Sequence, residues 1–248
     1  MELTRYIDSL EQDLNRIRSI HHDLSPTVPS CPGWDIGRLI GHLGRVHRMA
    51  LAVLTTGAMQ PAAPDQLESP PTDPSDLRAY FDTSAESIVK TLREIDPESP
   101  CWTFLGGPNQ ASFWFRRSAH EHSVHRVDAE MAIGDEHRIP ADIAVDGISE
   151  YFVIQNVRAL PNKPDFALPG SLHLHATDEG VHGEWMINHV DSRLVVTEEH
   201  GKGDAAIRGT ASDLLLGLWG RVDMRAGQQF ERFGSNAVID AMASLGGT

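Results

Sequence analysis

The chain has 248 residues, of which 40% are hydrophobic and 23% are charged, a composition typical of globular proteins of one large or two small domains. Its 21 basic and 35 acidic residues give a formal charge of −14, which argues against binding to nucleic acids or to anionic membrane surfaces. No signal peptide, membrane-spanning apolar stretch or disulfide framework is evident, so we expect a cytoplasmic protein without a membrane anchor.

The N-terminal part of the chain has the periodicity of amphipathic helices. Apolar residues recur at three- and four-residue intervals over 3–24 and again over 36–53, which predicts two helices with one apolar stripe each. Pro26 and Pro29 end the first helix, and Asp35 is favourable at the N-terminus of the second. Residues 58–74 contain five prolines and show no periodicity, which predicts an extended, exposed connection.

Three further helices are predicted downstream. The third begins near Ser75 and ends at Asp96-Pro97, the fourth covers 113–131, and the fifth covers 142–160. Amphipathic helices that are joined partly by long connections are typical of a bundle. We therefore predict an N-terminal domain over 1–162 that is a four-helix bundle, with up to five helices.

The pattern changes after residues 161–164. Short runs of β-forming residues predict strands over 171–176, 181–188, 193–197 and 205–209, separated by turns. A helix is expected to open at Ser212 or Asp213, with a last one near 236–244. The C-terminal domain, 165–248, is thus predicted to be small and α+β, which makes the whole chain an α+β protein of two domains.

Thirteen histidines raise the question of a metal site, because histidine is the commonest metal ligand. Glu121 and His125 are four residues apart and therefore lie on one face of the fourth helix. His42 faces inward with the apolar stripe of the second helix and is the best candidate for a third ligand. His120 and His125 are five apart, about 140° around a helix, which excludes the metalloprotease pattern. Two imidazoles and one carboxylate suit catalytic zinc, although nickel, iron or manganese can bind the same set.

Each candidate also has an interpretation without a metal. His42 would then be a hydrogen-bonded core histidine, and Glu121 with His125 a pair on the helix surface. Other polar residues of these helices are interpreted as solvated groups, as partners of the ligands, or as paired with neighbours: His47, His122, Arg126 and Asp128. His173 and His175 alternate with leucines, which indicates the solvent face of a strand.

Four sequence blocks, in this order, resemble the mycothiol-dependent maleylpyruvate isomerase family. The blocks are Cys31–Asp35, His42–His47, His120–Glu130 and Gly209–Arg221. The resemblance implies a DinB-like four-helix bundle that binds a divalent metal, commonly zinc, followed by a small α/β domain similar to sterol carrier proteins. It implies the ligands His42, Glu121 and His125, the same trio that helix geometry suggests.

The resemblance also implies an activity. The chain would be a metal-dependent, mycothiol-using isomerase or thiol S-transferase that acts on a small electrophile, for example one that carries a carboxylate. It would function as a monomer or homodimer. The mycothiol thiolate would add to an activated double bond, the resulting single bond would rotate, and elimination would return the thiol. Arg221 would bind the substrate carboxylate and take part in catalysis; its alternative interpretation is a cation at a helix C-terminus. The alternative function is a non-catalytic metal- and ligand-binding or regulatory protein on the same scaffold.

Overall fold

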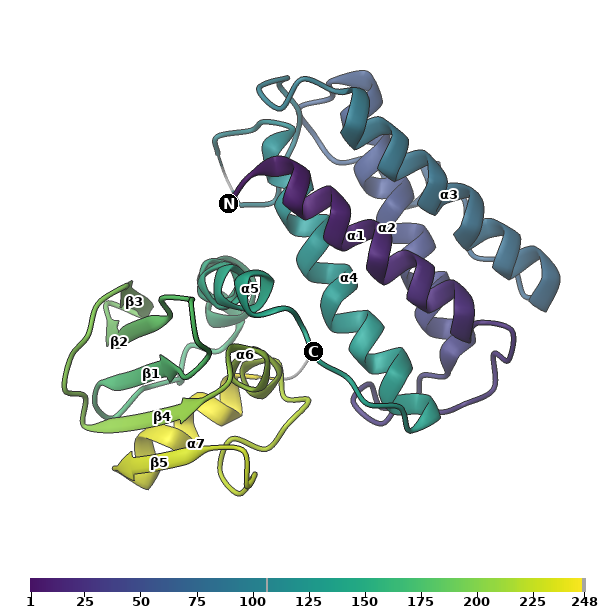
Figure 1. The fold of residues 1–248 in the computed structure, drawn as a ribbon. Coiled ribbons are helices and arrows are strands. Elements are labelled where there is room, and N and C mark those ends of the chain that lie inside the picture. The colour runs from purple at the N-terminus through teal and green to yellow at the C-terminus, as the bar shows by residue number, and fades with distance from the viewer. Residues whose placement is uncertain (106, 247–248) are drawn as a thin grey trace. The chain divides into compact units, whose positions relative to one another are not determined.

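A computed structural model describes residues 1–105 and 107–246 of the chain. It divides into two compact units, Met1–His137 and Arg138–Thr248. The first unit is helical and the second contains a small mixed sheet with helices, as Figure 1 shows. The predicted class, a helical bundle followed by a small α+β domain, is confirmed.

Four long helices form the N-terminal unit. They are α1 (Leu3–Ile20), α2 (Ile36–Thr56), α3 (Pro74–Glu94) and α4 (Ser112–Ile133). Helix α1 packs mainly along α4, and α2 packs along α3. The apolar stripes predicted from the sequence form the core between them, with Leu10 and Ile17 of α1 and Leu39 and Leu43 of α2 fully buried. Burial of these stripes is what stabilises the bundle.

The helix ends follow from local sequence. The Asp35 carboxylate accepts a hydrogen bond from the backbone N–H of Arg38 at 2.7 Å, which caps α2 as its position predicted. Helix α4 ends at Gly134, whose φ of 73° is a left-handed conformation that glycine adopts without strain. Between α2 and α3 the chain is exposed or half-buried, as predicted, and contains one short 3-10 turn, Pro64–Gln66.

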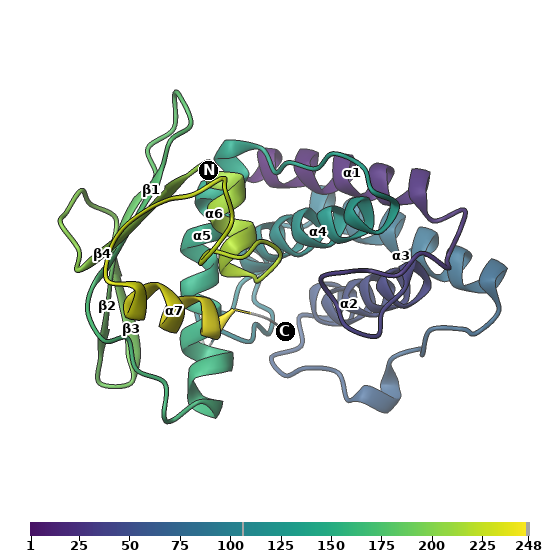
Figure 2. The ribbon, with the colours of Figure 1, turned by 90° about the horizontal axis from the view of Figure 1, so that it is seen from below.

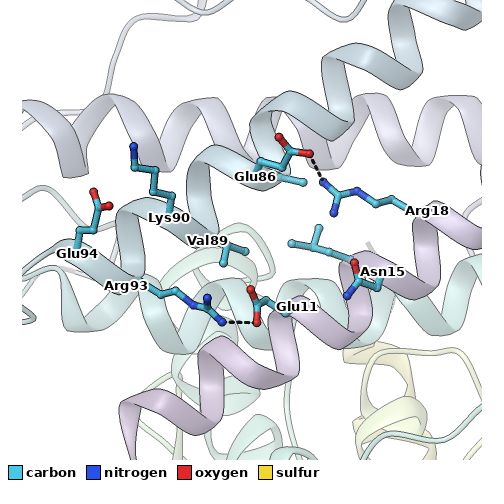
Figure 3. Close-up of a pocket in the computed structure, with 10 residues that line it drawn as sticks. Glu11, Asn15, Arg18, Glu86, Val89, Lys90, Arg93 and Glu94 are labelled. Carbon is cyan, nitrogen blue, oxygen red and sulfur yellow. Dashed lines mark hydrogen bonds and ion pairs between the residues drawn. The ribbon is translucent and has the colours of Figure 1, made fainter.

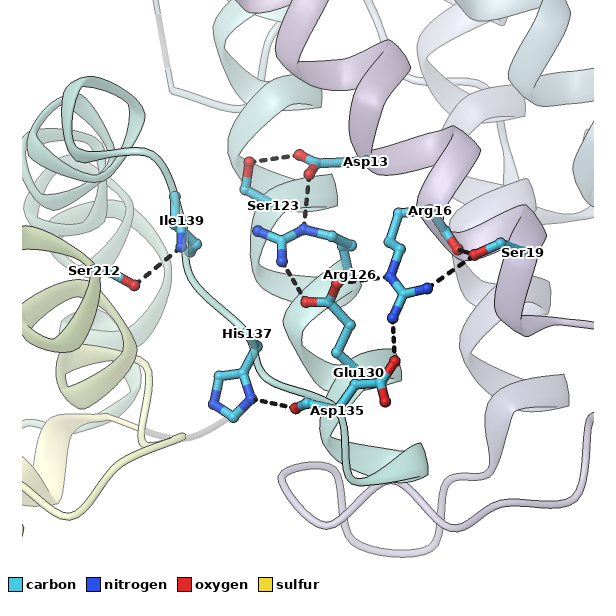
Figure 4. A network of polar contacts seen from close by, with 10 residues as sticks. All are labelled: Asp13, Arg16, Ser19, Ser123, Arg126, Glu130, Asp135, His137, Ile139 and Ser212. Atoms are coloured by element: carbon cyan, nitrogen blue, oxygen red, sulfur yellow. Dashed lines mark hydrogen bonds and ion pairs between the residues drawn. The ribbon is translucent and has the colours of Figure 1, made fainter.

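A buried network of ion pairs joins α1 to α4 (Figure 4). Asp13 accepts hydrogen bonds from Ser123 Oγ at 2.7 Å and from Arg126 Nε at 2.8 Å. Arg126 also pairs with Glu130, which in turn accepts a hydrogen bond from Arg16 Nε at 2.9 Å. The prediction that Arg126 pairs with its neighbours is confirmed. Polar side chains thus occupy buried positions of α4, which is why this helix shows little apolar periodicity.

The C-terminal unit is a five-stranded sheet with helices on one side, as Figure 2 shows. Its strands are β1 (Leu172–Ala176), β2 (Glu184–Val190), β3 (Arg193–Thr197), β4 (Ala205–Gly209) and β5 (Glu231–Gly234). Its helices are α5 (Ala141–Ile154), α6 (Ala211–Leu218) and α7 (Asn236–Leu245). A π-helical turn, Gln155–Ala159, and a 3-10 turn, Leu160–Asn162, extend α5.

The strand order is β3-β2-β1-β4-β5, with β1 parallel to β4 and the other pairs antiparallel. Because β3 and β4 are consecutive in the chain but not adjacent in the sheet, the connection over 198–204 has to pass β2 and β1. Leu172, Leu174 and Ile207 are fully buried on the side that packs against the helices. Strand β5, which is short and mostly exposed, was not predicted from the sequence.

Helix α5 differs from the sequence-based expectation, which assigned it to the bundle in a domain over 1–162. In the structure it belongs to the second compact unit, so the division falls between His137 and Arg138 rather than at 162–165. The Tyr151 ring packs edge-on against Trp219 with ring centroids 4.9 Å apart, and Trp185 Nε1 donates a hydrogen bond to Ser149 Oγ at 3.1 Å. An apolar stripe predicts that a helix is buried, but it does not say against which partner.

Within the part of the chain that the structure describes, no helix combines the length and the hydropathy that crossing a bilayer requires.

Candidate metal centre

The structure brings together the three predicted ligands, one from α2 and two from α4. His42 Nε2 lies 2.9 Å from Glu121 Oε1, and His125 Nε2 lies 3.4 Å from the same oxygen. The rings of the two histidines have centroids 5.0 Å apart. Each residue thus offers one ligand atom, and these atoms lie within 4.8 Å of one another. Helix α2 presents His42 beside its buried stripe, as the sequence indicated.

The trio is open on one side. His125 is buried, whereas the side chains of His42 and Glu121 keep 34% and 22% of their surface exposed. Trp34 covers another side: its ring stacks on His125 with an interplanar angle of 13°, and its centroid lies 5.1 Å from that of His42. The loop that carries Trp34 is closed by a backbone hydrogen bond to Cys31 and turns at Gly33, where φ is 78°. A partly open donor set next to an aromatic wall can admit a further ligand.

Asp128 lies behind His125 and fixes its orientation. His125 Nδ1 donates a hydrogen bond to Asp128 Oδ2 at 2.8 Å, and Asp128 also accepts hydrogen bonds from Ser30 Oγ at 2.5 Å and Cys31 Sγ at 3.6 Å. With the Nδ1 proton held by the carboxylate, Nε2 is the ring atom that can bind a metal. From the sequence, Asp128 is predicted only to pair with unspecified neighbours. The signal that could have identified it is its spacing of three residues from His125.

Arg117 positions the third ligand. Its Nη2 donates to Glu121 Oε2 at 2.7 Å, which leaves Oε1 directed at the two histidines. Burial opposes ionisation of Glu121, but the Arg117 cation and the hydrogen bonds with His125 and His42 hold the pKa of this carboxyl well below its usual range. Glu121 is therefore a carboxylate at neutral pH.

His125 is protonated at neutral pH in the absence of a metal. Burial lowers the pKa of His125, but its hydrogen bonds with Asp128 and Glu121 outweigh this effect and raise the pKa to about 9. Positive charge at this point is thus stabilised by two carboxylates. A divalent cation would take the place of that proton, and two imidazole nitrogens with a carboxylate oxygen are a donor set that transition metals accept. The residues present therefore fit a divalent transition metal.

His47 and His122 lie elsewhere than expected. The prediction that they are solvated or partners of the ligands is wrong: both are buried, with Nε2 atoms 2.7 Å apart and stacked rings. Ser84 Oγ lies 2.9 Å from His47 Nδ1, and the Ser118 carbonyl accepts a hydrogen bond from His122 Nδ1 at 2.7 Å. Burial lowers the pKa of His122 to about 4 and that of His47 well below its usual value, so the pair is neutral.

Arg221 lies in the C-terminal unit, just after α6. Its backbone N–H donates to the carbonyl of Leu216 at 2.8 Å, and its Nη1 donates to the carbonyl of Trp219 at 2.8 Å. The side chain is half-buried. A cation hydrogen-bonded to a carbonyl at a helix C-terminus is also what its alternative interpretation describes.

A separate surface groove of about 450 Å³ runs between α1 and α3 (Figure 3). Its charged side chains pair across it, Arg93 with Glu11 at 2.5 Å and Arg18 with Glu86 at 3.6 Å. The residues that line it include no histidine or cysteine. The groove therefore offers no donor set comparable to that of the trio.

Comparisons with known families agree with the two-part fold. The model of the mycothiol maleylpyruvate isomerase N-terminal domain matches residues 7–130, and that of the MDMPI C-terminal domain matches residues 142–241. The chain belongs to the mycothiol-dependent maleylpyruvate isomerase family. The resemblance inferred from the four sequence blocks is therefore confirmed, and the gap between the two matches contains the division between the compact units.

Two solved structures of this family have the same fold. They are crystal structures of the mycothiol-dependent maleylpyruvate isomerase and of a histidine-to-alanine variant of it, with TM-scores of 0.63 and 0.62. Each is 15% identical in sequence, and each alignment covers 94% of this chain and 93% of the other. A direct search of curated protein sequences gave no match.

Proposed function

We propose that this protein is a metal-dependent, mycothiol-using enzyme, an isomerase or thiol S-transferase that acts on a small electrophile. The observation that carries the proposal is the convergence of His42, Glu121 and His125 on one point that is open on one side. Membership of the isomerase family supports mycothiol as the thiol. Zinc is the metal that best suits two imidazoles and one carboxylate with an open position.

A divalent metal held by this trio would lower the pKa of a thiol that reaches its open side, which favours the nucleophilic thiolate. The chain's own residues prepare the site for this role. Asp128 holds the Nδ1 proton of His125, so the Nε2 lone pair faces the metal position. Arg117 keeps Glu121 ionised and occupies its second oxygen, so that Oε1 alone is directed inward. Trp34 keeps water from one side of the trio.

We assign substrate binding to Arg221, as the family resemblance implies. A guanidinium can hold a carboxylate through two parallel hydrogen bonds and can stabilise the negative charge that develops when a thiolate adds to a conjugated double bond. The residue is half-buried and anchored through Trp219, so its guanidinium is restrained in position. In an acidic protein, such a cation supplies the local positive charge that an anionic substrate needs.

The test combines metal loading with thiol titration. Metal-depleted full-length protein is reloaded with Zn²⁺, mycothiol binding is followed by calorimetry, and turnover of maleylpyruvate is measured with and without mycothiol. We expect mycothiol to bind tightly only to the loaded protein, and Glu121→Gln to abolish both metal retention and turnover. Glu86→Gln, on the exposed side of α3, is the matched control and should behave like the wild type.

Two results would contradict the proposal. Equal mycothiol affinity with and without metal would show that the metal has no part in binding the thiol. A metal-loaded protein that does not bind mycothiol and does not convert any electrophile in a thiol-dependent reaction would favour the non-catalytic alternative.

A further inference from the structure

A second group of possible metal ligands lies on the sheet of the C-terminal unit. His173 and His175 are two residues apart on β1, so their side chains leave the same face of the sheet, opposite to Leu172 and Leu174. Glu184 begins β2 and lies directly opposite His175 in the antiparallel register. The topology therefore places two imidazoles and one carboxylate on the face that α5, α6 and α7 do not cover.

One oxygen of Glu184 is the centre of this group. Its Oε2 lies 2.9 Å from His173 Nε2, 3.8 Å from His175 Nδ1 and 2.6 Å from His200 Nδ1. His200 belongs to the connection between β3 and β4. The His173 ring is 5.9 Å from that of His175 and 5.5 Å from that of His200, measured between centroids. Three imidazoles from two parts of the chain thus surround one carboxylate.

The burial of the group corrects the sequence interpretation, which placed His173 and His175 on a solvent face. His173 is only 6% exposed, because the β3–β4 connection lies against β1. Gly203 makes this approach possible: a Cβ at that position would lie 2.9 Å from the backbone nitrogen of His173. Exposure of the side chains then rises from His173 through His175 and Glu184 to His200, which is 80% exposed. The group is anchored at one end and accessible at the other.

A pocket of about 600 Å³ opens beside the group. Most of the charged side chains that line it are acidic, and they are Asp178, Glu179, Glu184, Glu198 and Glu199. Arg208 is the one arginine or lysine that lines it among the described residues. Concave surfaces lined by one sign of charge concentrate ions of the opposite sign. The pocket therefore favours a cation over an anion.

We propose that His173, His175, Glu184 and His200 bind a divalent transition metal such as Zn²⁺. Imidazole nitrogen is a ligand for zinc, copper, nickel and iron, whereas calcium and magnesium prefer an all-oxygen environment. Zinc bonds of about 2.0–2.2 Å in a tetrahedron place ligand atoms about 3.3–3.6 Å apart. The ligand atoms of His173, His175 and Glu184 lie within 4.8 Å of one another, and small side-chain adjustments bring them to this arrangement. The exposed His200, whose Nδ1 lies 2.6 Å from Glu184 Oε2, would complete the set by a larger side-chain movement. The proposal uses residues outside the His42 trio and stands independently of the catalytic function.

The test uses full-length protein in which the first candidate site is removed. A His42→Ala/Glu121→Gln variant is depleted of metal and titrated with Zn²⁺ by calorimetry, and with Co²⁺ to record the absorption bands of the bound ion. We expect one bound equivalent in this background, and its loss when Glu184→Gln is added. His189→Ala, on the same strand but against Phe166, is the matched control and should retain the equivalent.

Two further variants keep the test decisive if Glu184→Gln fails to fold. His175→Gln and His200→Gln alter partly or largely exposed side chains, and each should weaken Zn²⁺ binding at least tenfold with an unchanged circular dichroism spectrum. The proposal is overturned if the background variant binds no metal, or if its bound equivalent persists in both histidine variants. In either case the hydrogen bonds of this group serve only to hold the β3–β4 connection against the sheet.

Discussion

His125 donates a hydrogen bond from Nδ1 to Oδ2 of Asp128 at 2.8 Å, and the side chain of Asp128 has no exposed surface. Ser30 and Cys31, from the loop between α1 and α2, hold the same carboxylate. The orientation of His125 on α4 therefore depends on a segment nearly a hundred residues earlier, because the hydrogen bond from Ser30 to Asp128 spans 98 positions. We therefore expect Asp128 to act as a positioning residue for the proposed ligands His42, Glu121 and His125.

Asp128→Asn is expected to lower Zn²⁺ affinity by about 10- to 100-fold, because a ligating imidazole loses the partner that fixes its tautomer and raises its basicity. Competition with a chelator of known affinity measures the change. Asp8→Asn, on an exposed position of α1, should leave the affinity unaltered. A full-affinity Asp128→Asn protein would show that Asp128 has only a structural role.

Arg126→Ala is expected to destabilise the N-terminal unit by about 3–5 kcal/mol, since it leaves the buried Asp13 carboxylate without its cation and leaves Glu130 paired with Arg16 alone. Urea denaturation followed by circular dichroism gives the free energy of unfolding. Arg93→Ala breaks the ion pair with Glu11 on the surface and should cost about 1 kcal/mol or less. Equal losses in the two variants would mean that the network contributes no more than a surface pair.

Acidification is expected to destabilise the fold through His47 and His122. Burial lowers the pKa of both histidines in the folded state. Below the unfolded pKa of about 6.5, these histidines therefore bind protons in the unfolded chain but not in the folded chain. The stability contributed by this pair is therefore fully present above about pH 6.5 and falls as the pH is lowered to the folded pKa, which is about 4 for His122. From about pH 7.5 to about pH 5 the loss from His122 alone is about 2 kcal/mol.

Denaturant titrations at both pH values, with wild type and His47→Gln, test this expectation. The variant should lose part of the pH dependence, whereas His22→Gln, at the exposed end of α1, should retain all of it. A His47→Gln protein with an unchanged slope against pH would assign the effect to other groups.

Arg221→Lys is expected to lower kcat/KM about 10- to 100-fold with metal content unchanged, because a charge-assisted hydrogen bond to a carboxylate contributes about 1.5–3 kcal/mol. Steady-state kinetics with mycothiol and metal analysis of the same preparation separate the two effects. Arg225→Lys, an exposed residue bonded to Asp223, is the control. Unaltered kinetics in the Arg221→Lys protein would instead support the alternative interpretation, in which this arginine is only a cation at a helix C-terminus.

The helices and the trio were predictable because each depends on local spacing. The apolar stripe that buries Leu39 and Leu43 also determines the side of the helix on which His42 lies. A spacing of four residues on one helix places Glu121 beside His125. The family resemblance, which rests on short blocks in a fixed order, is likewise a property of the sequence alone. Only the meeting of His42 with the pair on α4 depends on packing, because it requires α2 to lie against α4.

The features that were missed depend on partners from elsewhere in the chain. His47 is buried because α3 and α4 supply Ser84 and His122, and no periodicity in α2 indicates either contact. His173 is buried because a connection crosses the strand that carries it. The amphipathic pattern of α5 is compatible with a bundle as well as with a sheet, so its place in the second unit required the fold.

The pairing of α1 with α4 also bears on synthesis of the chain. Asp13 meets Ser123 across 110 positions, whereas α2 and α3 are neighbours in sequence and can associate first. At about 5–20 residues per second on the ribosome, α4 is synthesised on the order of 5–20 s after α1. During that interval the apolar stripe of α1 is exposed, so nascent chains that stall before α4 should be the forms most sensitive to protease and most dependent on chaperones.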